Sequence, residues 1–404
     1  MGKKLAIIGN GMAAARLAEE LTRRAPGRYA IAIVGDEPRL AYNRVLLSAL
    51  LAREASLDEI ELKPMAWWWA NRIKLMLGRP ARSVDVAARR VTLTGGATLD
   101  FDRLVFATGS QPIRPPMPGI DLPGVVAFRD LDDVAAMARA AAPGTRVVMI
   151  GGGLLGLEAA HGLMKAGARV TVLHLMDRLM ERQLDGQAAA MLKRAIERRG
   201  IVVVTGAETA RIAGVERVEA VELKDGRSFD ADLVVVAVGV RPNIALARDA
   251  GVATGRGVVV DDRLETNIGG IHAIGDCAEH RGQCHGLVES AHAQAAALAQ
   301  ILAGDTVRYP GCVPAASLKV TGIGLFSAGD FLGERGGEAI VLSDPGRGSY
   351  RKLVLRDGRL AGAVLYGDST DSAWYRELIG TGEKVAAFRG ELAFGRALAA
   401  PAAA

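Results

Sequence analysis

Two glycine-rich loops in this chain have the residue types and spacing to bind phosphate groups. The first, Gly9–Ala14, reads GNGMAA and follows the apolar run Leu5–Ile8. The second, Gly151–Gly156, reads GGGLLG and follows the apolar run Val147–Ile150. Each loop would join a buried strand to a helix, whose first backbone amides and positive end attract a pyrophosphate. Two such loops predict two dinucleotides on one chain, and the simplest pair is a flavin and a nicotinamide that exchange electrons.

The elements after the first loop would bring a carboxylate to the same site. A helix is predicted over 13–24 and a strand over Tyr29–Val34, after which come Gly35, Asp36 and Glu37. A carboxylate about 20 residues beyond such glycines can accept hydrogen bonds from a ribose diol. We therefore expect Asp36, or failing that Glu37, to bind the adenosine ribose; the alternative is an acid in an exposed turn.

The strand after the second loop ends differently. It is predicted over Arg169–Leu173 and continues into His174 and Leu175, so it lacks the acid that usually ends this strand in NAD-specific sites. Arg178 could contact a 2′-phosphate, but Asp177 beside it opposes that role. These residues leave the choice between NADH and NADPH open.

A buried strand that ends in small residues follows each of the two glycine-loop units. Leu104–Gly109 and Leu233–Gly239 form an internal repeat, since each follows a strand, a glycine loop and a helix. A further apolar strand, Ile271–Ile274, ends in Gly275 and Asp276. Strands that alternate with helices in this way predict an α/β fold with two Rossmann-like dinucleotide-binding domains.

Two regions have a different pattern. Val215–Leu223 and Ser228–Asp232 are expected to form a β-hairpin within the second unit. From residue 309 onward, short strands alternate with turns, and a helical region follows near Ser372. This part predicts a separate small C-terminal α+β domain over 309–396, and the alanine-rich residues 397–404 are expected to be a frayed tail.

Bulk properties narrow the possible functions. A chain of 404 residues is long enough for two or three domains, and its net charge of +5 is modest. The lack of a polybasic run and the 4% aromatic content argue against nucleic acid as a partner. No apolar run is long enough to span a bilayer and no signal peptide is recognisable, so we expect a cytoplasmic protein without membrane contact. Three cysteines, an odd number, also suit a reducing compartment.

The cysteines also limit the redox chemistry. None occurs before Cys277, which argues against a disulfide reductase or a cysteine-dependent peroxidase, because both need a thiol that faces the flavin. The possible metal ligands nearby are Cys277, His280, Cys284 and His285. Because Cys277 directly follows a strand-ending Gly-Asp turn, ordinary loop residues are the preferred interpretation and no metal is predicted.

The ordered motifs resemble those of the FAD-dependent pyridine nucleotide reductases. In chain order, they are the Gly9 loop, Ala107–Gly109, the Gly151 loop, Gly239–Asn243 and Ala273–Asp276. The resemblance implies a discontinuous FAD domain formed by 1–110 and 241–308, with an NAD(P)H domain over 111–240 inserted between them. It also implies bound FAD, with NADH preferred to NADPH as the second nucleotide.

Shorter strings narrow the resemblance to the flavin part of bacterial NAD(P)H-dependent nitrite reductases and to the electron-transfer subunits of assimilatory nitrate reductases. These strings are Tyr42–Ser48, Leu179–Asp185, Leu318–Gly322, Leu325–Asp330 and Leu365–Asp368. The nitrite reductase large subunits continue into iron–sulfur and sirohaem regions, whose cysteine clusters this chain lacks. The resemblance therefore favours an electron-transfer subunit of nitrate assimilation.

Such a subunit would pass electrons from NADH through the flavin to an iron–sulfur partner, here the molybdenum-containing catalytic subunit of nitrate reductase. A rubredoxin, a ferredoxin or a nitrite reductase stays open as the acceptor. An alternative of another class is a flavin-binding redox sensor or interaction protein.

The residues and the resemblance together assign the nucleotide contacts. Those expected at FAD are Gly9, Gly11, Met12, Ala13, Ala14, Asp36, Glu37, Arg44, Ala81, Thr108, Gly109, Arg129, Gly275, Asp276 and Val288. Those expected at NAD(P)H are Gly151, Gly153, Leu154, Leu155, Gly156, Glu158, His174, Arg178 and Gly239.

Three of these contacts carry specific roles. By resemblance, Arg129 reaches the FAD phosphates and Glu158 lies near the nicotinamide, while Asp276 binds the ribityl chain or the pyrophosphate. The structural alternatives are a surface ion pair for Arg129, a carboxylate at a helix start for Glu158 and a helix cap for Asp276. The flavin itself carries the redox chemistry, so no catalytic side chain beyond it is required.

Overall fold

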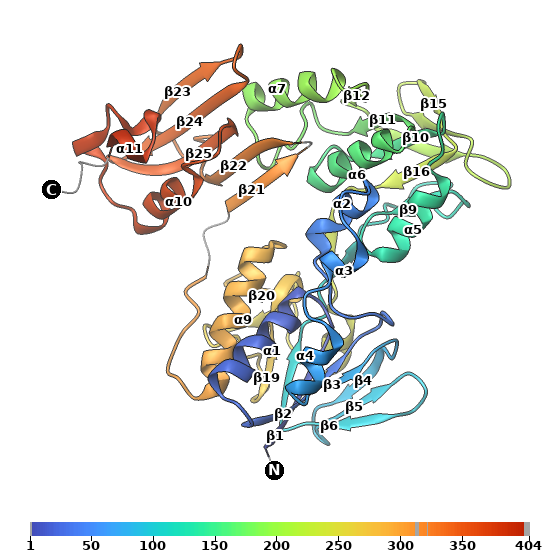
Figure 1. Cartoon of the computed structure of the whole chain (residues 1–404), viewed down its shortest axis with the longest axis vertical. Coiled ribbons are helices and arrows are strands. Elements are labelled where there is room, and N and C mark those ends of the chain that lie inside the picture. Colours follow the sequence, from blue (N-terminus) through green and yellow to red (C-terminus); the bar gives the residue numbers. More distant parts are fainter. Residues whose placement is uncertain (1, 312–314, 321, 400–404) are drawn as a thin grey trace. The chain divides into compact units, whose positions relative to one another are not determined.

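The computed structural model describes residues 2–311, 315–320 and 322–399 of the chain (Figure 1). The chain divides into two compact units. The first unit comprises Met1–Leu47, Ala55–Pro112 and Val240–Cys312, and the second comprises Ser48–Glu54, Ile113–Gly239 and Val313–Ala404. The chain therefore leaves the first unit three times, after Leu47, Pro112 and Cys312, and returns to it after the first two departures.

A five-stranded parallel sheet forms the centre of the first unit. Its order is β19-β7-β1-β2-β3, formed by Ile271–Ala273, Arg103–Phe106, Lys3–Ile8, Tyr29–Val34 and Lys74–Met76. The register places Ile7 of β1 between Ile33 of β2 and Val105 of β7. All three side chains are fully buried, as the continuous apolar runs of parallel strands predict.

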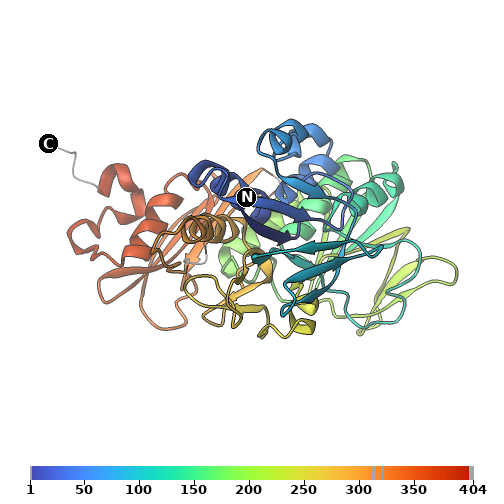
Figure 2. The ribbon, with the colours of Figure 1, turned by 90° about the horizontal axis from the view of Figure 1, so that it is seen from below.

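Two helices pack together in this unit. Helix α1 (Met12–Arg24) begins directly after the first glycine loop and lies beside α9 (Val288–Ala303), as both views show (Figure 1; Figure 2). Buried Ala14 and Ala18 on α1, with Ala295 on α9, leave room for a close approach of the two backbones.

Shorter elements complete the first unit. An antiparallel sheet consists of β4 (Ala81–Asp85), β5 (Arg90–Leu93) and β6 (Thr98–Asp100). The short helices are η1 (Arg44–Leu46), α3 (Leu57–Ile60), α4 (Met65–Ala70), α8 (Ala245–Asp249) and η2 (Gly275–Cys277). Strands β18 (Val258–Val260) and β20 (Ala278–His280) pair in parallel.

Two short strands mark where the chain crosses between the units. Strand β8 (Ser110–Pro112) pairs antiparallel with β17 (Val240–Pro242) in the first unit. Directly beyond them, in the second unit, the N–H of Ile113 donates to the carbonyl of Gly239 at 2.9 Å. The outgoing and returning segments therefore run together as a paired ribbon.

The second unit repeats the parallel architecture. Its sheet order is β12-β11-β10-β16-β9, formed by Val202–Thr205, Arg169–His174, Arg146–Ile150, Leu233–Val236 and Val125–Ala127. The helices of this part are α2 (Leu47–Leu51), α5 (Leu131–Ala140), α6 (Leu154–Lys165) and α7 (Gly186–Glu197). The predicted α/β class with two Rossmann-like folds is confirmed by the two parallel sheets.

The predicted hairpin of the second unit differs in its extent. The structure has three antiparallel strands, β13 (Thr209–Ala213), β14 (Ala220–Leu223) and β15 (Ser228–Asp230). The prediction of a strand from Val215 onward is wrong, because Val215 lies in the turn before β14 and is 86% exposed. The chain turns back at Gly214, where a Cβ would lie 1.9 Å from the carbonyl oxygen of Arg217.

The C-terminal part of the second unit has its own sheet and core. The antiparallel order β21-β22-β25-β24-β23 is formed by Ala315–Val320, Ile323–Gly329, Arg359–Gly367, Ser349–Arg356 and Glu338–Asp344. Helix α10 (Ser372–Thr381) packs on β25 with Tyr375 and Leu378 buried against the sheet. The chain then forms η3 (Ala386–Phe388), η4 (Leu392–Phe394) and α11 (Arg396–Ala399), and residues 400–404 of the predicted tail lie outside the described residues.

Asp185 joins this sheet to the parallel part of the second unit. One carboxylate oxygen accepts the N–H of Ala188 at 3.0 Å and so caps α7. The other accepts the hydroxyl of Tyr350 on β24 at 2.6 Å, and the Lys352 ammonium lies 3.8 Å from it. One acid therefore supports both a helix start and the attachment of the sheet.

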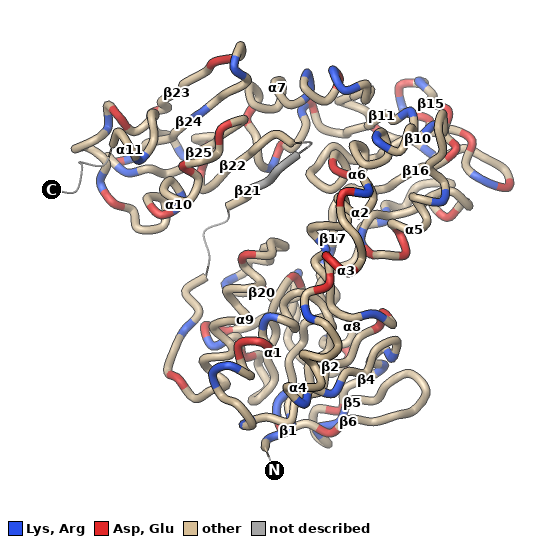
Figure 3. Tube along the Cα trace, viewed as in Figure 1, with Lys and Arg blue, Asp and Glu red and all other residues tan. Residues whose placement is uncertain are grey.

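Charged residues of both signs are interspersed along both units (Figure 3). In the part of the chain that the structure describes, no helix has both the length and the apolar content needed to cross a bilayer.

Candidate functional site

The first glycine loop lies against the end of β7. Gly9 has φ +112°, and a Cβ built there would lie 2.0 Å from the carbonyl oxygen of Ala107. Only glycine lets the two backbones approach this closely. Gly11 is the N-cap of α1 without a side-chain cap, and a Cβ at Gly11 would meet open space. The first amides of α1 therefore face a space that a phosphate group can enter.

A pocket of about 590 Å³ opens in the first unit beside this loop. Four of the residues predicted at FAD line it, namely Gly9, Asp36, Ala81 and Thr108. Arg241, Arg248 and Arg256 add cations to the wall, which suits a ligand that carries phosphates. The pocket, its cations and the glycine turn are the features that a dinucleotide requires.

The structure separates the roles of the two adjacent acids. Asp36 lines the pocket. Glu37 is instead engaged by the hydroxyl of Tyr42 at 2.8 Å and by the guanidinium of Arg44. Asp36 is thus the better placed of the two to bind a ribose. Arg44, which was also predicted at FAD, forms an ion pair with Glu37.

Residues from three strand ends meet on the far side of the loop. The Ser110 hydroxyl donates to Asp276 at 2.6 Å. The Thr108 hydroxyl donates to the carbonyl of Asn243 at 2.7 Å, and the Asn243 amide donates back to the carbonyl of Thr108 at 2.9 Å. A Cβ at Gly275 would lie 3.1 Å from that of Ala13, so Gly275 and Asp276 lie against the start of α1.

The remaining residues predicted at FAD fall into two groups. Met12, Ala13 and Ala14 form the first turn of α1, and Val288 is the first residue of α9, both in the first unit. Arg129 belongs to the second unit, where its N–H donates to Asp133 at 2.8 Å. Its contact with FAD phosphates stays a prediction.

The second glycine loop repeats the geometry of the first. Gly151 has φ +121°, and a Cβ there would lie 2.3 Å from the carbonyl oxygen of Ala237, the counterpart of Ala107. Gly153 is the N-cap of α6 without a side-chain cap, and Leu154 and Leu155 follow in its first turn. Gly156 packs on the loop itself, since a Cβ there would lie 2.2 Å from the carbonyl oxygen of Gly151.

His174 ends β11 as a buried residue with two hydrogen bonds. Its Nδ1 accepts the N–H of Gly152 at 3.0 Å, and its Nε2 lies 3.0 Å from a carboxylate oxygen of Glu181. Arg178 donates to Asp177 at 3.2 Å, and its buried Nε has no partner among the described residues. Both residues predicted here therefore lie beside the second loop, and Glu181 joins them.

Glu158 lies in the second turn of α6 and is half-buried. Burial raises its pKa to about 7, and a hydrogen bond with the Ser48 side chain partly offsets the shift. Both residues belong to the second unit. A carboxyl with this pKa can hold or release a proton at neutral pH.

The two cysteines within the described residues, Cys277 and Cys284, are free. Cys277 is buried with its thiol 3.3 Å from the carbonyl of Ile274, and burial raises its pKa. Burial also raises the pKa of Cys284 to about 11. His280 hydrogen-bonds to Asp262 at 2.9 Å. Within the described ranges no group of three His, Cys, Asp or Glu residues could hold a metal, and Cys312 lies outside them.

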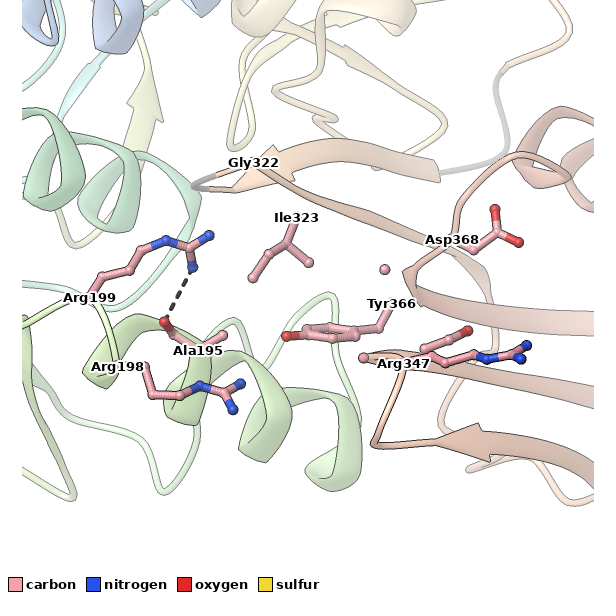
Figure 4. Close-up of a pocket in the computed structure, with 11 residues that line it drawn as sticks. Ala195, Arg198, Arg199, Gly322, Ile323, Arg347, Tyr366 and Asp368 are labelled. Carbon is pink, nitrogen blue, oxygen red and sulfur yellow. Dashed lines mark hydrogen bonds between the residues drawn. The ribbon is translucent and has the colours of Figure 1, made fainter.

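A second cavity, of about 800 Å³, lies in the second unit between the end of α7 and the C-terminal sheet (Figure 4). Arg198 and Arg199 line one side of it, and Arg199 donates to the carbonyl of Ala195 at 3.2 Å, as cations at helix C-termini commonly do. Burial raises the pKa of the Tyr366 hydroxyl on the opposite side. None of the residues that line this cavity belongs to either glycine loop.

Sequence reasoning missed several residues of the site region. Ser110 directly follows the motif Ala107–Gly109, and Arg241 and Asn243 lie within the motif Gly239–Asn243, but no nucleotide contact was predicted for any of the three. Glu181 and Ser48 come from segments that return to the second loop and its helix from elsewhere in the chain. No local pattern signals such contacts.

Comparison with known proteins assigns a family to both parts of the chain. Residues 3–297 match the family described as pyridine nucleotide-disulphide oxidoreductase. Residues 314–383 match the rubredoxin NAD+ reductase C-terminal domain.

Individual relatives agree with this assignment. The chain is 43% identical over 373 residues to nitrite reductase [NAD(P)H] of Bacillus subtilis (strain 168), covering 92% of this chain and 46% of the relative. It is 39% identical over 370 residues to the assimilatory nitrate reductase electron transfer subunit of the same organism, covering 91% and 48%. The chain thus spans about half the length of these curated relatives.

A solved structure matches over nearly the whole chain. The ferredoxin reductase for the CYP199A2 system from Rhodopseudomonas palustris has a TM-score of 0.88 and 28% identity, over 95% of this chain and 96% of that chain. The glycine loops, the pocket with its cations and the match over most of the sequence lead to one conclusion: this chain belongs to the pyridine nucleotide-disulphide oxidoreductase family.

Proposed function

We propose that this chain oxidises NADH and passes the electrons through bound FAD to an iron–sulfur redox protein, the molybdenum-containing catalytic subunit of an assimilatory nitrate reductase. The observation that carries the proposal is the combination of two dinucleotide loops with no cysteine before Cys277. Without a thiol relay, electrons that enter from a nicotinamide leave the flavin for an external acceptor. The relative named as an electron transfer subunit supports nitrate reductase as that acceptor.

The residues of the chain divide the binding work between them. Bound FAD would accept a hydride and release electrons singly. The start of α1 and the arginines of the pocket would hold its phosphates, and Asp36 its adenosine ribose. The start of α6 would hold the NADH pyrophosphate, and Glu158 would contact the nicotinamide. A cytoplasmic location is part of the proposal and is supported by the free thiols.

A second acceptor class is favoured by the C-terminal domain. Residues 314–383 match a domain described for rubredoxin reductase, and the ferredoxin reductase from Rhodopseudomonas palustris matches over the whole chain. A rubredoxin or ferredoxin is therefore the alternative acceptor, and a nitrite reductase is a further one. A flavin-binding sensor, the remaining alternative, would turn over slowly with every acceptor.

The test compares acceptors on one preparation. The purified chain is expected to be yellow, to be reduced by NADH, and to transfer electrons fastest to a nitrate reductase catalytic subunit with nitrate present. Ferredoxin, rubredoxin and ferricyanide serve as competing acceptors. A faster rate with ferredoxin or rubredoxin would replace the nitrate reductase assignment. A protein that stays colourless after reconstitution with FAD would overturn the proposed function.

A further inference from the structure

The end of β11 holds a histidine where NAD-specific Rossmann sites hold an acid. That acid binds the adenosine ribose diol and repels a 2′-phosphate. In this chain His174 fills the position and is buried. Its two ring nitrogens are both used, by the N–H of Gly152 and by Glu181, each at 3.0 Å. His174 therefore has no ring nitrogen left for a ribose.

The hydrogen bonds define the protonation of the pair. Nδ1 accepts a backbone N–H and so carries no proton, which leaves the proton on Nε2. Nε2 then donates to the Glu181 carboxylate. The exposed Arg182 guanidinium lies 4.0 Å from the other carboxylate oxygen of Glu181. The end of β11 thus presents one carboxylate, as in an NAD-specific site, but the carboxylate comes from a different residue.

The segment that carries Glu181 is held against the glycine loop. The N–H of Met180 donates to the carbonyl of Gly152 at 3.1 Å. A Cβ built on Gly152 would lie 2.5 Å from a Leu179 methyl carbon and 2.8 Å from the His174 ring. These contacts, together with the His174 hydrogen bond, hold Glu181 beside the loop where the NAD(P)H pyrophosphate is expected.

Two neighbouring features suit the adenosine end of a nucleotide. Leu175 and Met176 follow β11 directly, and their apolar side chains are 59% and 45% exposed. An adenine ring can pack on such a surface. On the other side of the pair, Arg178 is 31% exposed and is engaged by Asp177, so its charge is partly offset.

We propose that Glu181, held by His174, is the residue that binds the adenosine ribose diol of NADH and disfavours the 2′-phosphate of NADPH. His174 is a positioning residue that transfers the role of the strand-ending acid to a carboxylate seven residues further along the chain. This inference rests on the proposed oxidation of a nicotinamide nucleotide, and it names the determinant of the nucleotide's specificity.

The test substitutions are Glu181→Gln, with Asp177→Asn as the matched control. Each removes one negative charge from the same loop, but Asp177 pairs with Arg178 and only Glu181 contacts His174. Asp177→Asn is therefore expected to affect NADPH alone and to leave KM for NADH unchanged. We expect Glu181→Gln to raise KM for NADH about tenfold, because a charge-assisted hydrogen bond to the ribose is lost. KM for NADPH should fall, because the charge that repels the 2′-phosphate is removed. The kcat of flavin reduction should stay within about twofold, because nothing changes at the nicotinamide. Calorimetric Kd values for NAD+ and NADP+ should change in the same directions in the absence of turnover.

A rescue experiment separates this role from a structural one. In the Glu181→Gln background, His174→Glu restores an acid at the strand end, and we expect NADH preference to return. Equal weakening for both nucleotides, a rise in KM for NADH no larger than that of Asp177→Asn, or failure of the rescue in a protein with wild-type flavin content would overturn the inference. A wild-type protein whose flavin is reduced by neither nucleotide would instead overturn the proposed function.

Discussion

Glu158 is the residue of the candidate site whose charge depends most directly on its surroundings. It lies on α6 just beyond the second glycine loop, where burial raises the pKa of its carboxyl to about 7 and the Ser48 side chain lowers it in part. At neutral pH the charge of this carboxyl therefore changes with small changes in pH.

This environment predicts a pH-dependent stability. The folded chain holds the Glu158 proton more tightly than the unfolded chain, so its contribution is fully present below the ordinary pKa of 4.5 and is lost as the pH rises through about 7. Glu158→Gln has no titrating carboxyl at this position, so its stability should not decrease in this way as the pH rises. We expect the Tm of the wild type to fall relative to that of the variant between about pH 5 and pH 8, by the equivalent of up to about 3 kcal/mol.

A control substitution isolates the effect. Glu216→Gln removes an exposed acid from the turn before β14 and should leave the pH dependence of Tm unchanged. If the wild type and Glu158→Gln give parallel curves, the carboxyl has an ordinary pKa in the folded chain and the argument for its protonation fails.

At the scale of elements, the two strand–loop–helix units share one steric device. Gly9 meets the carbonyl of Ala107 and Gly151 meets that of Ala237, in both cases at a positive φ. A side chain at either position would push the loop away from the neighbouring strand end. The helix start would then no longer point its amides at the phosphate position.

These close backbone contacts predict that a Gly→Ala substitution weakens the binding of a different nucleotide in each loop. We expect Gly9→Ala to lose most of its FAD, since the clash with Ala107 adds to the strain of a positive φ, which costs about 1–3 kcal/mol. Gly151→Ala should retain FAD but require at least about tenfold more NADH for half-maximal flavin reduction, a loss of more than about 1.4 kcal/mol. Flavin absorbance and stopped-flow reduction measure the two effects.

Gly27→Ala serves as the control for backbone strain. Gly27 also has a positive φ, +74°, but a Cβ there meets no atom within 4 Å. It should keep both FAD and the response to NADH. Loss of FAD from Gly151→Ala, or from the control, would show that general instability and not loop geometry is responsible.

The secondary-structure elements also explain which features could be predicted from the sequence and which could not. The glycine loops and their strands were predictable because each pattern is local and each strand is apolar throughout. The strand predicted from Val215 was too long because Val215 and Val218 favour a strand locally, whereas the reversal at Gly214 places residues 214–219 between β13 and β14. The His174–Glu181 pair and the Ser48 contact with Glu158 depend on segments that fold back onto the loop, and a periodic pattern contains no such information.

At the scale of the whole molecule, Asp185 links the C-terminal sheet to the parallel part of the second unit. Its carboxylate caps α7 and accepts a hydrogen bond from the Tyr350 hydroxyl. Removing a hydrogen bond to a charged acceptor costs about 1.5–3 kcal/mol. We therefore expect Tyr350→Phe to speed the proteolytic release of the C-terminal domain. NADH-dependent reduction of the flavin should be unchanged.

Tyr366→Phe is the matched control for this prediction. Tyr366 pairs opposite Tyr350 in the same sheet, and its hydroxyl does not contact Asp185. It should leave the rate of release near that of the wild type. Equal acceleration by both substitutions would point to a general weakening of the sheet.

The paired ribbon of β8 and β17 has a consequence for biosynthesis. A ribosome that has made the first 239 residues has supplied the parallel sheet of the second unit, but β19 and α9 are still missing. Until they emerge, β7 carries an unpaired edge and α1 lacks its helical neighbour. The nascent polypeptide must therefore keep this unpaired edge strand out of contact with other chains while the next 60 or so residues are translated, which takes about 3–12 seconds at ordinary elongation rates. Chaperone demand and the toxicity of premature stop codons should be greatest within this window.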